Sequence, residues 1–260
     1  MTESLDGKIA LVTGGGTGIG RATAEALAAQ GATTVVVGRR QTPLDETVAA
    51  ISAAGNATAS TVVADLADPN EAERLAAAVL ASHGRVDILI NNAGFSSKVR
   101  SPRYSRADEW RAVMDVNTLG PMILTRDLLP AMTAQGGGDI VLVSSIAALR
   151  PNVMAGTAYS AAKAAARAYM QVLAEEVRAE DIRCTTVFPG EVDTPILDNR
   201  PLPPDVDARA TMMMPEDIAD AIVLAVSLPR RTTMLEVTLS ATSPRDMRED
   251  VRMAREKRTP

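Results

Sequence analysis

A tyrosine and a lysine stand four residues apart in the stretch Tyr159-Ser160-Ala161-Ala162-Lys163. On a helix this spacing places the phenol and the ammonium on one face. A phenol, with a reference pKa of ~10, is a weak acid-base catalyst at neutral pH, and a nearby positive charge favours its ionised form. Such a pair is common by itself, but here Ser144 and Ser145 end an apolar run that precedes it. Together these residue types indicate proton transfer to or from a substrate oxygen.

A second group of residues is the glycine run Val12-Thr13-Gly14-Gly15-Gly16-Thr17-Gly18-Ile19-Gly20, which follows an apolar stretch. Glycines at this density are unfavourable inside a strand or a helix, so they indicate a turn that a ligand approaches closely. A helix that starts here would direct its N-terminal N–H groups at an anion. The spacing differs from the phosphate loop of ATPases, because Arg21-Ala22 replace Lys and Ser or Thr, and also from G-x-G-x-x-G. The alternative is a purely structural bend.

The elements that must position these residues are short apolar runs alternating with Ala-rich amphipathic segments. We expect strands at 8–13, 33–37, 59–63, 86–90, 139–143, 182–187 and 234–239, and helices at 18–30, 43–54, 69–83, 105–134, 157–180 and 215–227. Segment 105–134 should contain two helices, the second restarting near Asn117. Continuous apolar strands are typical of sheets covered on both faces. Residues 1–260 are therefore expected to form one α/β domain, a Rossmann fold with a doubly wound parallel sheet of about seven strands and helices on both faces.

Two segments depart from this alternation. Residues 191–214 are rich in Pro and Met without a clear period, which indicates a loop inserted over a site. The run Met212-Met213-Met214 in it is expected to pack in that lid or in an interface. Residues 244–260 are strongly charged, and we expect a solvated tail or a subunit contact there.

The composition narrows the function classes. The chain has 260 residues, a formal charge of −5 and only 2% aromatic residues, and it carries no basic stripe with interleaved aromatics, so a nucleic-acid partner is not expected. The single Cys184 cannot form an internal disulfide and is expected to be buried and reduced. We find no leader sequence and no run of ~20 apolar residues, which predicts a cytoplasmic protein without a membrane partner.

The glycine run has the form T-G-x-x-x-G-x-G, and on it the sequence resembles the short-chain dehydrogenase/reductase family. Four further elements follow in the order of that family: Asn91-Asn92-Ala93-Gly94, Asn117, Ser145 with Tyr159-x-x-x-Lys163, and Pro189-Gly190-x-x-x-Thr194. The resemblance covers about nine-tenths of the chain. It weakens at the C-terminus, where relatives often have a glycine-rich end.

The resemblance implies hydride transfer between a nicotinamide and a carbonyl or secondary alcohol, of a ketone or 3-oxoacyl type. Tyr159 would be the acid/base, and Lys163 would lower the pKa of Tyr159 and hold the nicotinamide ribose. Ser145 would position the substrate oxygen, with Ser144 as the alternative, and Asn117 would order a relay water. The cofactor contacts implied are Gly14, Gly16, Thr17, Gly18, Ile19, Asp65, Leu66, Asn92, Ala93, Gly94, Tyr159, Lys163, Pro189, Gly190, Val192 and Thr194.

The end of the second strand favours NADP(H) over NAD(H). An NAD enzyme usually places Asp or Glu there to bind the adenosine ribose, whereas this chain has Gly38 followed by Arg39. A guanidinium can bind the 2′-phosphate as a bidentate partner. The alternative is that Arg39 and Arg40 are solvated loop residues.

Other readings of the sequence stay open. A catalytically silent NADP-binding sensor or scaffold needs only the dinucleotide half, and an epimerase or dehydratase could use the same fold. No metal site is expected, because one His and one Cys cannot supply a zinc site. The basic residues Lys98, Arg100, Arg103 and Arg106 could meet an acidic substrate, but a solvated loop face is the expectation. By resemblance, the protein forms a homodimer or homotetramer through 105–134 and 157–180.

Overall fold

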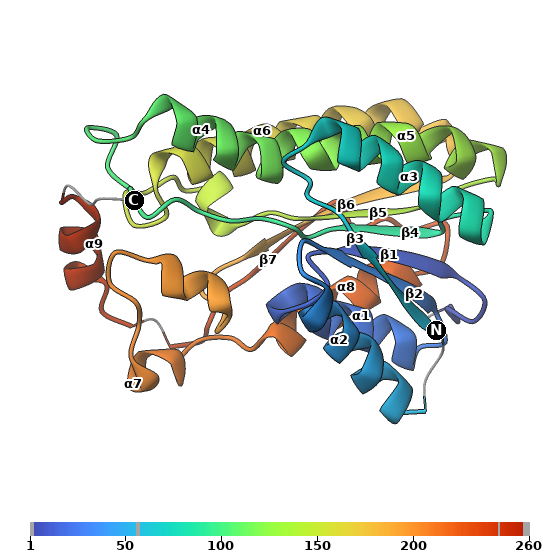
Figure 1. Cartoon of the computed structure of the whole chain (residues 1–260), viewed down its shortest axis with the longest axis horizontal. Helices are drawn as coiled ribbons and strands as arrows, with labels where there is room; N and C mark the ends of the chain where they lie inside the picture. Colours follow the sequence, from blue (N-terminus) through green and yellow to red (C-terminus); the bar gives the residue numbers. More distant parts are fainter. Residues whose placement is uncertain (1–2, 56–57, 244, 257–260) are drawn as a thin grey trace.

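The computed structural model describes residues 3–55, 58–243 and 245–256. Its centre is a parallel seven-stranded sheet in the order β3-β2-β1-β4-β5-β6-β7 (Figure 1). The strands are β1 (Ile9–Thr13), β2 (Thr33–Gly38), β3 (Ala59–Val63), β4 (Ile88–Asn91), β5 (Gly138–Val143), β6 (Ile182–Pro189) and β7 (Glu236–Leu239). The order reverses beside β1, so the carboxyl ends of β1 and β4 border a crevice where α/β sheets bind ligands.

Helices cover both faces of the sheet, as the sequence predicts (Figure 1). One face carries α1 (Gly18–Ala29), α2 (Gln41–Ala53) and α8 (Pro215–Ser227), and the other carries α3 (Pro69–His83), α4 (Ala107–Met114), α5 (Gly120–Ala134) and α6 (Thr157–Glu176). The remaining pieces are short: π-helix η1 (Asp115–Leu119), 3₁₀ turns η2 (Ile146–Ala148), η3 (Val177–Glu180) and η4 (Pro195–Asn199), and α7 (Val206–Arg209) and α9 (Arg248–Ala254).

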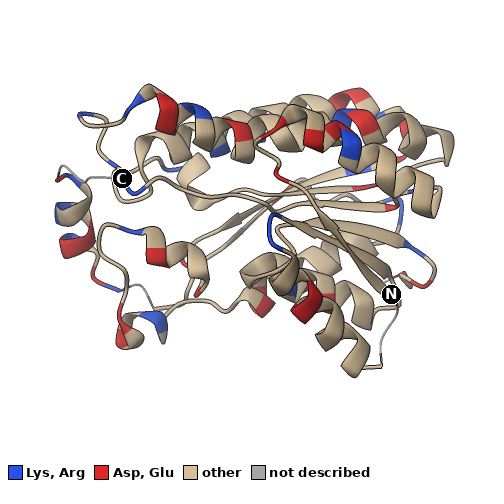
Figure 2. Ribbon diagram, in the orientation of Figure 1, with Lys and Arg blue, Asp and Glu red and all other residues tan. Residues whose placement is uncertain are grey.

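The apolar strands contribute side chains to two hydrophobic cores, one on each face of the sheet. In β1, Leu11 packs with Leu89 and Ile140 in the core on one face, whereas its neighbour Val12 packs with Val36 in the core on the other. Successive side chains of a strand point to opposite faces, so most strand positions are apolar when both faces are covered. Most charged residues lie on the outer helices and loops, with both signs interspersed (Figure 2), and a buried exception is the ion pair of Arg183 in β6 with Asp139 in β5.

The interruption near Asn117 is present as predicted. Helix α4 ends at Met114, the π-helical turn η1 follows, and α5 begins at Gly120. The Asn117 side chain occupies the wider turn, where its amide donates to Val113 O at 2.8 Å and to Phe95 O at 2.9 Å. An asparagine that satisfies carbonyls in this way stabilises a local break in the helix.

Residues 245–254 differ from the expected solvated tail. They fold as a short segment ending in α9, in which Asp250 and Ala254 are buried. Arg245 forms ion pairs with Glu191 and with Asp250, at 3.0 and 2.7 Å, so it ties this segment to the loop after β6. Figure 1 shows α7 and α9 together beyond the same end of the sheet. The expectation of a solvated tail is wrong for Arg245 and Asp250, because the sequence does not show which charges form buried ion pairs; the subunit contact stays a prediction. Residues 244 and 257–260 lie outside the described residues.

Two further expectations can be compared with the fold. Cys184 is buried in β6, and this burial raises the pKa of its thiol to about 12. Within the described residues, no helix is both long and apolar enough to cross a bilayer.

Candidate active site

Two adjoining hollows lie at the carboxyl ends of the strands. The larger has a volume of about 560 Å³ and is lined by segments that follow β1, β4, β5 and β6. Of the residues singled out from the sequence, it contains Gly14, Thr17, Gly18, Ile19, Asn92, Ala93, Gly94, Ser144, Ser145, Tyr159, Lys163, Pro189, Gly190, Val192 and Thr194. The smaller, of about 180 Å³, contains Gly14, Gly16, Thr17, Arg39, Asp65, Leu66, Ala93 and Gly94. Residues far apart in the sequence thus meet at one edge of the sheet.

The glycine loop brings bare backbone to both hollows. Gly14 and Gly18 have φ of +65° and +53°, a region that residues with a side chain rarely adopt. A Cβ at Gly18 would lie 3.0 Å from Cγ2 of Thr194, so the loop passes close to the segment after β6. Helix α1 starts at Gly18 without a side-chain cap from Thr17. Its first N–H groups therefore have no side-chain acceptor and can bind an anion.

The Asn91-Asn92-Ala93-Gly94 segment holds this loop in place. The Thr13 hydroxyl accepts hydrogen bonds from the backbone N–H groups of Asn92 and Ala93, both at 3.0 Å. In return, the side-chain amide of Asn92 donates to the carbonyls of Thr13 and Gly14, at 2.9 and 3.3 Å. The two polar turns therefore fix each other across the neighbouring strands β1 and β4.

Ser145 and Tyr159 face each other inside the larger hollow. Ser145 follows β5 and caps η2 by accepting a hydrogen bond from the Ala147 N–H at 3.2 Å. Tyr159 projects from the first turn of α6, and its hydroxyl is hydrogen-bonded to Ser145. Burial raises the pKa of Tyr159 above the ordinary value of a phenol, and the Ser145 hydrogen bond and nearby Arg100 and Arg200 lower it in part.

Lys163 lies one turn further along α6 and is almost fully buried. Its ammonium donates to the Val143 carbonyl at 2.9 Å and lies 5.7 Å from the centroid of the Tyr159 ring. Burial lowers the pKa of Lys163 to about 8, because the charged form is poorly solvated there. The Ser144 hydroxyl donates to the Lys163 carbonyl at 3.3 Å, so this serine braces α6 against β5.

Asn117 lines neither hollow directly and lies behind Gly94. A Cβ at Gly94 would come within 2.7 Å of Asn117 Oδ1 and 3.3 Å of Lys163 Nζ, so glycine leaves space between these two polar groups. Asn117 Oδ1 is buried and has no hydrogen-bond partner among the described residues. An acceptor without a partner beside a buried ammonium is a suitable place for a bridging water.

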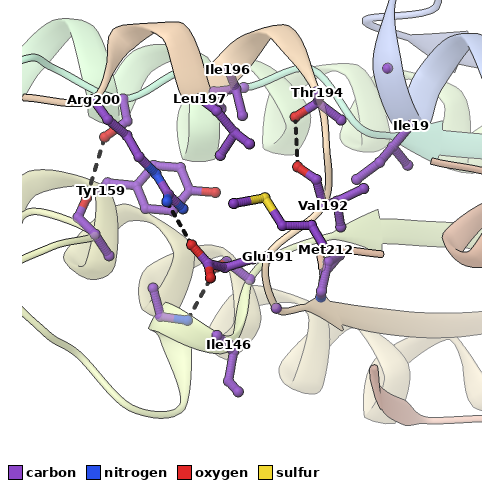
Figure 3. A pocket seen from close by; sticks show the side chains of 18 of the residues that line it. Ile19, Ile146, Tyr159, Glu191, Val192, Thr194, Ile196, Leu197, Arg200 and Met212 are labelled. Carbon is purple, nitrogen blue, oxygen red and sulfur yellow. Dashed lines mark hydrogen bonds and ion pairs between the residues drawn. The ribbon is translucent and has the colours of Figure 1, made fainter. Parts of the chain in front are cut away.

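The Pro189-to-Thr194 segment forms the wall opposite α6. Gly190 N–H donates to the Leu239 carbonyl at 2.8 Å, which fixes the exit from β6 against β7. The buried Thr194 hydroxyl donates to the Val192 carbonyl at 3.3 Å (Figure 3).

The smaller hollow carries the basic residues at the end of β2. Arg39 and Arg40 are exposed, and within the described residues neither side chain has a hydrogen bond or an ion pair. Across the hollow, the Asp65 carboxylate accepts a hydrogen bond from the Ala67 N–H at 3.0 Å. Nothing in the described part of the chain groups three or more His, Cys, Asp or Glu side chains in a way that could hold a metal ion.

Comparison with known proteins shows which enzyme family has this arrangement of residues. The sequence model of the short chain dehydrogenase family matches residues 8–203. The chain belongs to the short-chain dehydrogenase/reductase family. It is therefore an NAD(P)-dependent oxidoreductase that acts on small molecules with CH–OH or C=O groups.

Individual relatives of this short-chain dehydrogenase match over most of its length. An uncharacterised oxidoreductase of Staphylococcus saprophyticus is 34% identical over 92% of this chain and 99% of its own length. A fatty acyl-CoA reductase of Acinetobacter baylyi is 36% identical over 88% of this chain and 76% of its own length. A metagenomic short-chain oxidoreductase solved in complex with NADP has a TM-score of 0.80 at 33% identity, over 93% of this chain and all of that one.

The residues of this dehydrogenase fit a nicotinamide dinucleotide. The backbone at Gly14 packs closely on the neighbouring turn and has no room for a side chain, since a Cβ there would lie 2.8 Å from Asn92 Nδ2. The uncapped start of α1 suits a pyrophosphate, and Arg39 and Arg40, unpaired among the described residues, suit further negative charge beside the smaller hollow.

Four charged residues of the larger hollow were not chosen as site residues from the sequence: Arg100, Glu191, Arg200 and Arg245. Arg200 donates to Glu191 at 2.6 Å, and Figure 3 shows this pair beside Tyr159 and Met212. The expectation of a solvated face holds for Lys98, Arg103 and Arg106, but it is wrong for Arg100, which is buried. Met212 also lines the hollow, although the sequence indicated packing in a lid or interface. No local pattern distinguishes these residues from ordinary loop residues.

Proposed function

We propose that this short-chain dehydrogenase reduces a ketone with NADPH, or oxidises the corresponding secondary alcohol with NADP⁺, using Tyr159 as the acid/base. The observation that carries the proposal is the cluster of Ser145, Tyr159 and Lys163 in one hollow, next to the glycine loop. A protein that only sensed the dinucleotide would have no need for this hydroxyl pair and buried ammonium.

Each side chain has a role that its contacts support. The bound cofactor supplies the hydride, and the protein supplies orientation and proton transfer. Tyr159 gives its proton to the substrate oxygen during reduction and takes it back during oxidation. Ser145, hydrogen-bonded to Tyr159, orients and polarises the same oxygen. Lys163 holds the nicotinamide ribose and, through its positive charge, favours the ionised phenol.

Asn117 and Lys163 mark the route by which the proton is replaced. The unpaired Asn117 Oδ1 lies beside the space that Gly94 leaves open toward Lys163 Nζ. A water held there would connect the ammonium with solvent and reprotonate Tyr159 after each turnover. The remaining residues of the two hollows bind the dinucleotide, with Asp65 and Leu66 at the adenine and Pro189, Gly190, Val192 and Thr194 at the nicotinamide.

We propose NADP(H) as the preferred cofactor. Gly38 removes the acid that would repel a 2′-phosphate, and the exposed, unpaired Arg39 can form two hydrogen bonds with it. The structural relative solved with NADP supports this preference.

We also propose a homodimer or homotetramer assembled through segments 105–134 and 157–180. Two exposed apolar side chains on these segments, Leu119 and Val172, support this interface, because association would remove them from water. Sedimentation of the wild type and of a Val172→Glu variant would test it, and a monomeric wild type would disprove it.

The test of the function is NADPH oxidation, followed by absorbance, with a panel of ketones and oxoacyl thioesters. Tyr159→Phe should lose at least about 10³-fold in kcat, the scale of general acid-base catalysis, while NADPH affinity stays within a few-fold. An active Tyr159→Phe variant would disprove the assignment of the acid/base. Tight NADPH binding without turnover by the wild type would favour the sensor instead.

A further inference from the structure

Arg100 is a buried cation in the larger hollow, and among the described residues it has no carboxylate partner. It is 4% exposed, and its guanidinium donates to uncharged acceptors: Nη1 to the Ala155 carbonyl at 2.7 Å and to the Ser96 hydroxyl, and Nη2 to the Asn199 carbonyl at 3.2 Å. Its Nε has no hydrogen-bond partner within the described residues. A buried charge is expensive unless an opposite charge accompanies it.

The carboxylates near Arg100 pair with other arginines, so they do not balance its positive charge. Arg200 and Arg245 both pair with Glu191, at 2.6 and 3.0 Å, and Arg245 pairs with Asp250 at 2.7 Å. Among the described residues, these three guanidinium groups therefore share two carboxylates, so Arg100 has none, and Lys163 is a further cation of the same hollow. Burial and the charge of Arg200 lower the pKa of Arg100 to about 10, in the direction expected for a buried cation without a counter-ion.

Arg100 and Arg200 line the same hollow as Tyr159, the proposed acid/base. Arg100 bonds the carbonyl of Asn199, the residue before Arg200, so the two cations border the same part of the hollow. Both lower the pKa of Tyr159, so both act on the hydroxyl that meets the reacting oxygen. The rest of this wall is apolar and includes Ile146, Leu197 and Met212 (Figure 3).

Building on the proposed function, we infer that Arg100, together with Arg200, binds a carboxylate of the substrate. The substrate is then an oxo acid, or the matching hydroxy acid, whose apolar part lies against Ile146, Leu197 and Met212. The carboxylate takes no part in the reaction, and it supplies the negative charge that the three arginines lack. If Arg100 served only to join the loops at Ser96, Ala155 and Asn199, an uncharged hydrogen-bond donor could do the same. It would avoid the free-energy cost of burying a charge.

Matched pairs of acids and esters test this inference in the full-length protein. The substrates are benzoylformate, acetoacetate and levulinate, each beside its methyl ester, so that the carboxylate charge is the main difference within a pair. We expect the wild type to have a kcat/KM for at least one acid that is at least about tenfold above that for its ester. In Arg100→Met the acid should lose at least about 30-fold, the size expected when one partner of a buried charge pair is removed, and the ester only a few-fold.

Further variants separate charge recognition from loop structure. Arg103→Met removes an exposed positive charge from the same segment and should leave the ratio of acid to ester unchanged. Arg100→Lys keeps the charge and should retain part of the preference for the acid, and Arg200→Gln should reduce it. Equal losses for acid and ester in Arg100→Met, or a wild type that prefers no acid, would overturn the inference while leaving the reductase activity in place.

If the protein reduces none of these oxo compounds, a binding measurement still tests the carboxylate site. Calorimetric titration of the protein–NADP⁺ complex with benzoate should give binding that Arg100→Met weakens at least about tenfold and Arg103→Met does not change. Benzoate binding without reduction of any ketone would remove the proposed function but keep the carboxylate site. Absence of benzoate binding to the wild type, together with absence of acid turnover, would overturn the carboxylate site.

Discussion

The ammonium of Lys163 lies 5.7 Å from the ring centroid of Tyr159 and donates to the main-chain carbonyl of Val143. In this position Lys163 is held by the strand end rather than by the phenol. Ser145, Arg100 and Arg200 each lower the pKa of Tyr159. In the proposed mechanism, acid-base catalysis therefore depends on the walls of the hollow as well as on the tyrosine and lysine of α6.

Replacing Ser145 should change the pH dependence of alcohol oxidation. Oxidation needs unprotonated Tyr159, so its rate rises as pH approaches the pKa of this phenol. Ser145→Ala removes a hydrogen bond that lowers this pKa, so the rising limb of kcat/KM should move to higher pH. Ser144→Ala, whose hydroxyl bonds the Lys163 carbonyl instead, should leave the limb in place. A limb unmoved by Ser145→Ala would contradict the role of this hydrogen bond.

Lys163 should make the stability of the protein depend on alkaline pH. Its pKa is about 8 in the folded protein, whereas the ordinary value for a lysine is 10.5. Burying the charged ammonium therefore lowers the free energy of unfolding below pH 8, and this penalty decreases as pH rises toward 10.5. Lys163→Met never carries the charge. Its stability relative to the wild type should therefore fall by about 2 kcal/mol between about pH 7.5 and about pH 9.5. Urea unfolding of both proteins measures this, and a constant difference would show that the ammonium is not desolvated.

Gly38 should control the choice of nucleotide. A Cβ at this position would lie 3.4 Å from Leu44 Cδ2, an ordinary contact, so a side chain can be added without strain. In Gly38→Asp the carboxylate would repel a 2′-phosphate and bind the ribose hydroxyl, so kcat/KM should fall about 100-fold with NADPH and rise several-fold with NADH. Gly38→Ala serves as the uncharged control. An unchanged ratio of NADPH to NADH activity in the aspartate variant would refute the proposed preference.

Arg245 should hold α9 over the substrate hollow. It pairs with Glu191 on the loop after β6 and with Asp250 on α9, and it is itself largely buried. Arg245→Gln should loosen both segments, raise the KM for substrate several-fold and speed proteolysis within 245–256, with NADPH affinity unchanged. Arg248→Gln removes an exposed arginine that pairs with Asp246 at 2.6 Å and is the matched control. Equal proteolysis of the two variants would argue against this role.

The local sequence predicted much of the framework. Each strand and long helix lies close to its expected range, because continuous apolar runs and amphipathic periods depend on neighbours in the chain. The predicted helix end at His83 is also confirmed, since Gly84 closes α3 with a φ of +74°. The glycine loop and the helix break at Asn117 follow from local backbone chemistry in the same way.

The charges around the substrate hollow needed the tertiary structure. In the sequence, Arg100 has the same appearance as Arg103 and Arg106, yet only Arg100 turns inward. The C-terminal charges were expected in a solvated tail or a subunit contact, yet Arg245 pairs within the chain with Glu191 and with the buried Asp250. Burial of a charge depends on which distant groups pack around it, and this is not encoded in the spacing of neighbouring residues.

The sequence by itself thus determined the strand and helix order, the family, and the identity of the hydroxyl and ammonium groups that meet at the strand ends. Only the tertiary structure decided which cations surround Tyr159 and that Arg100 has no carboxylate partner in the part of the chain that the structure describes. The physical reason is that secondary structure responds to periodicity along the chain. The pKa of a side chain and the balance of charge in a cavity depend instead on residues that are distant in the sequence and close in space, here residues 100, 159, 191, 200 and 245.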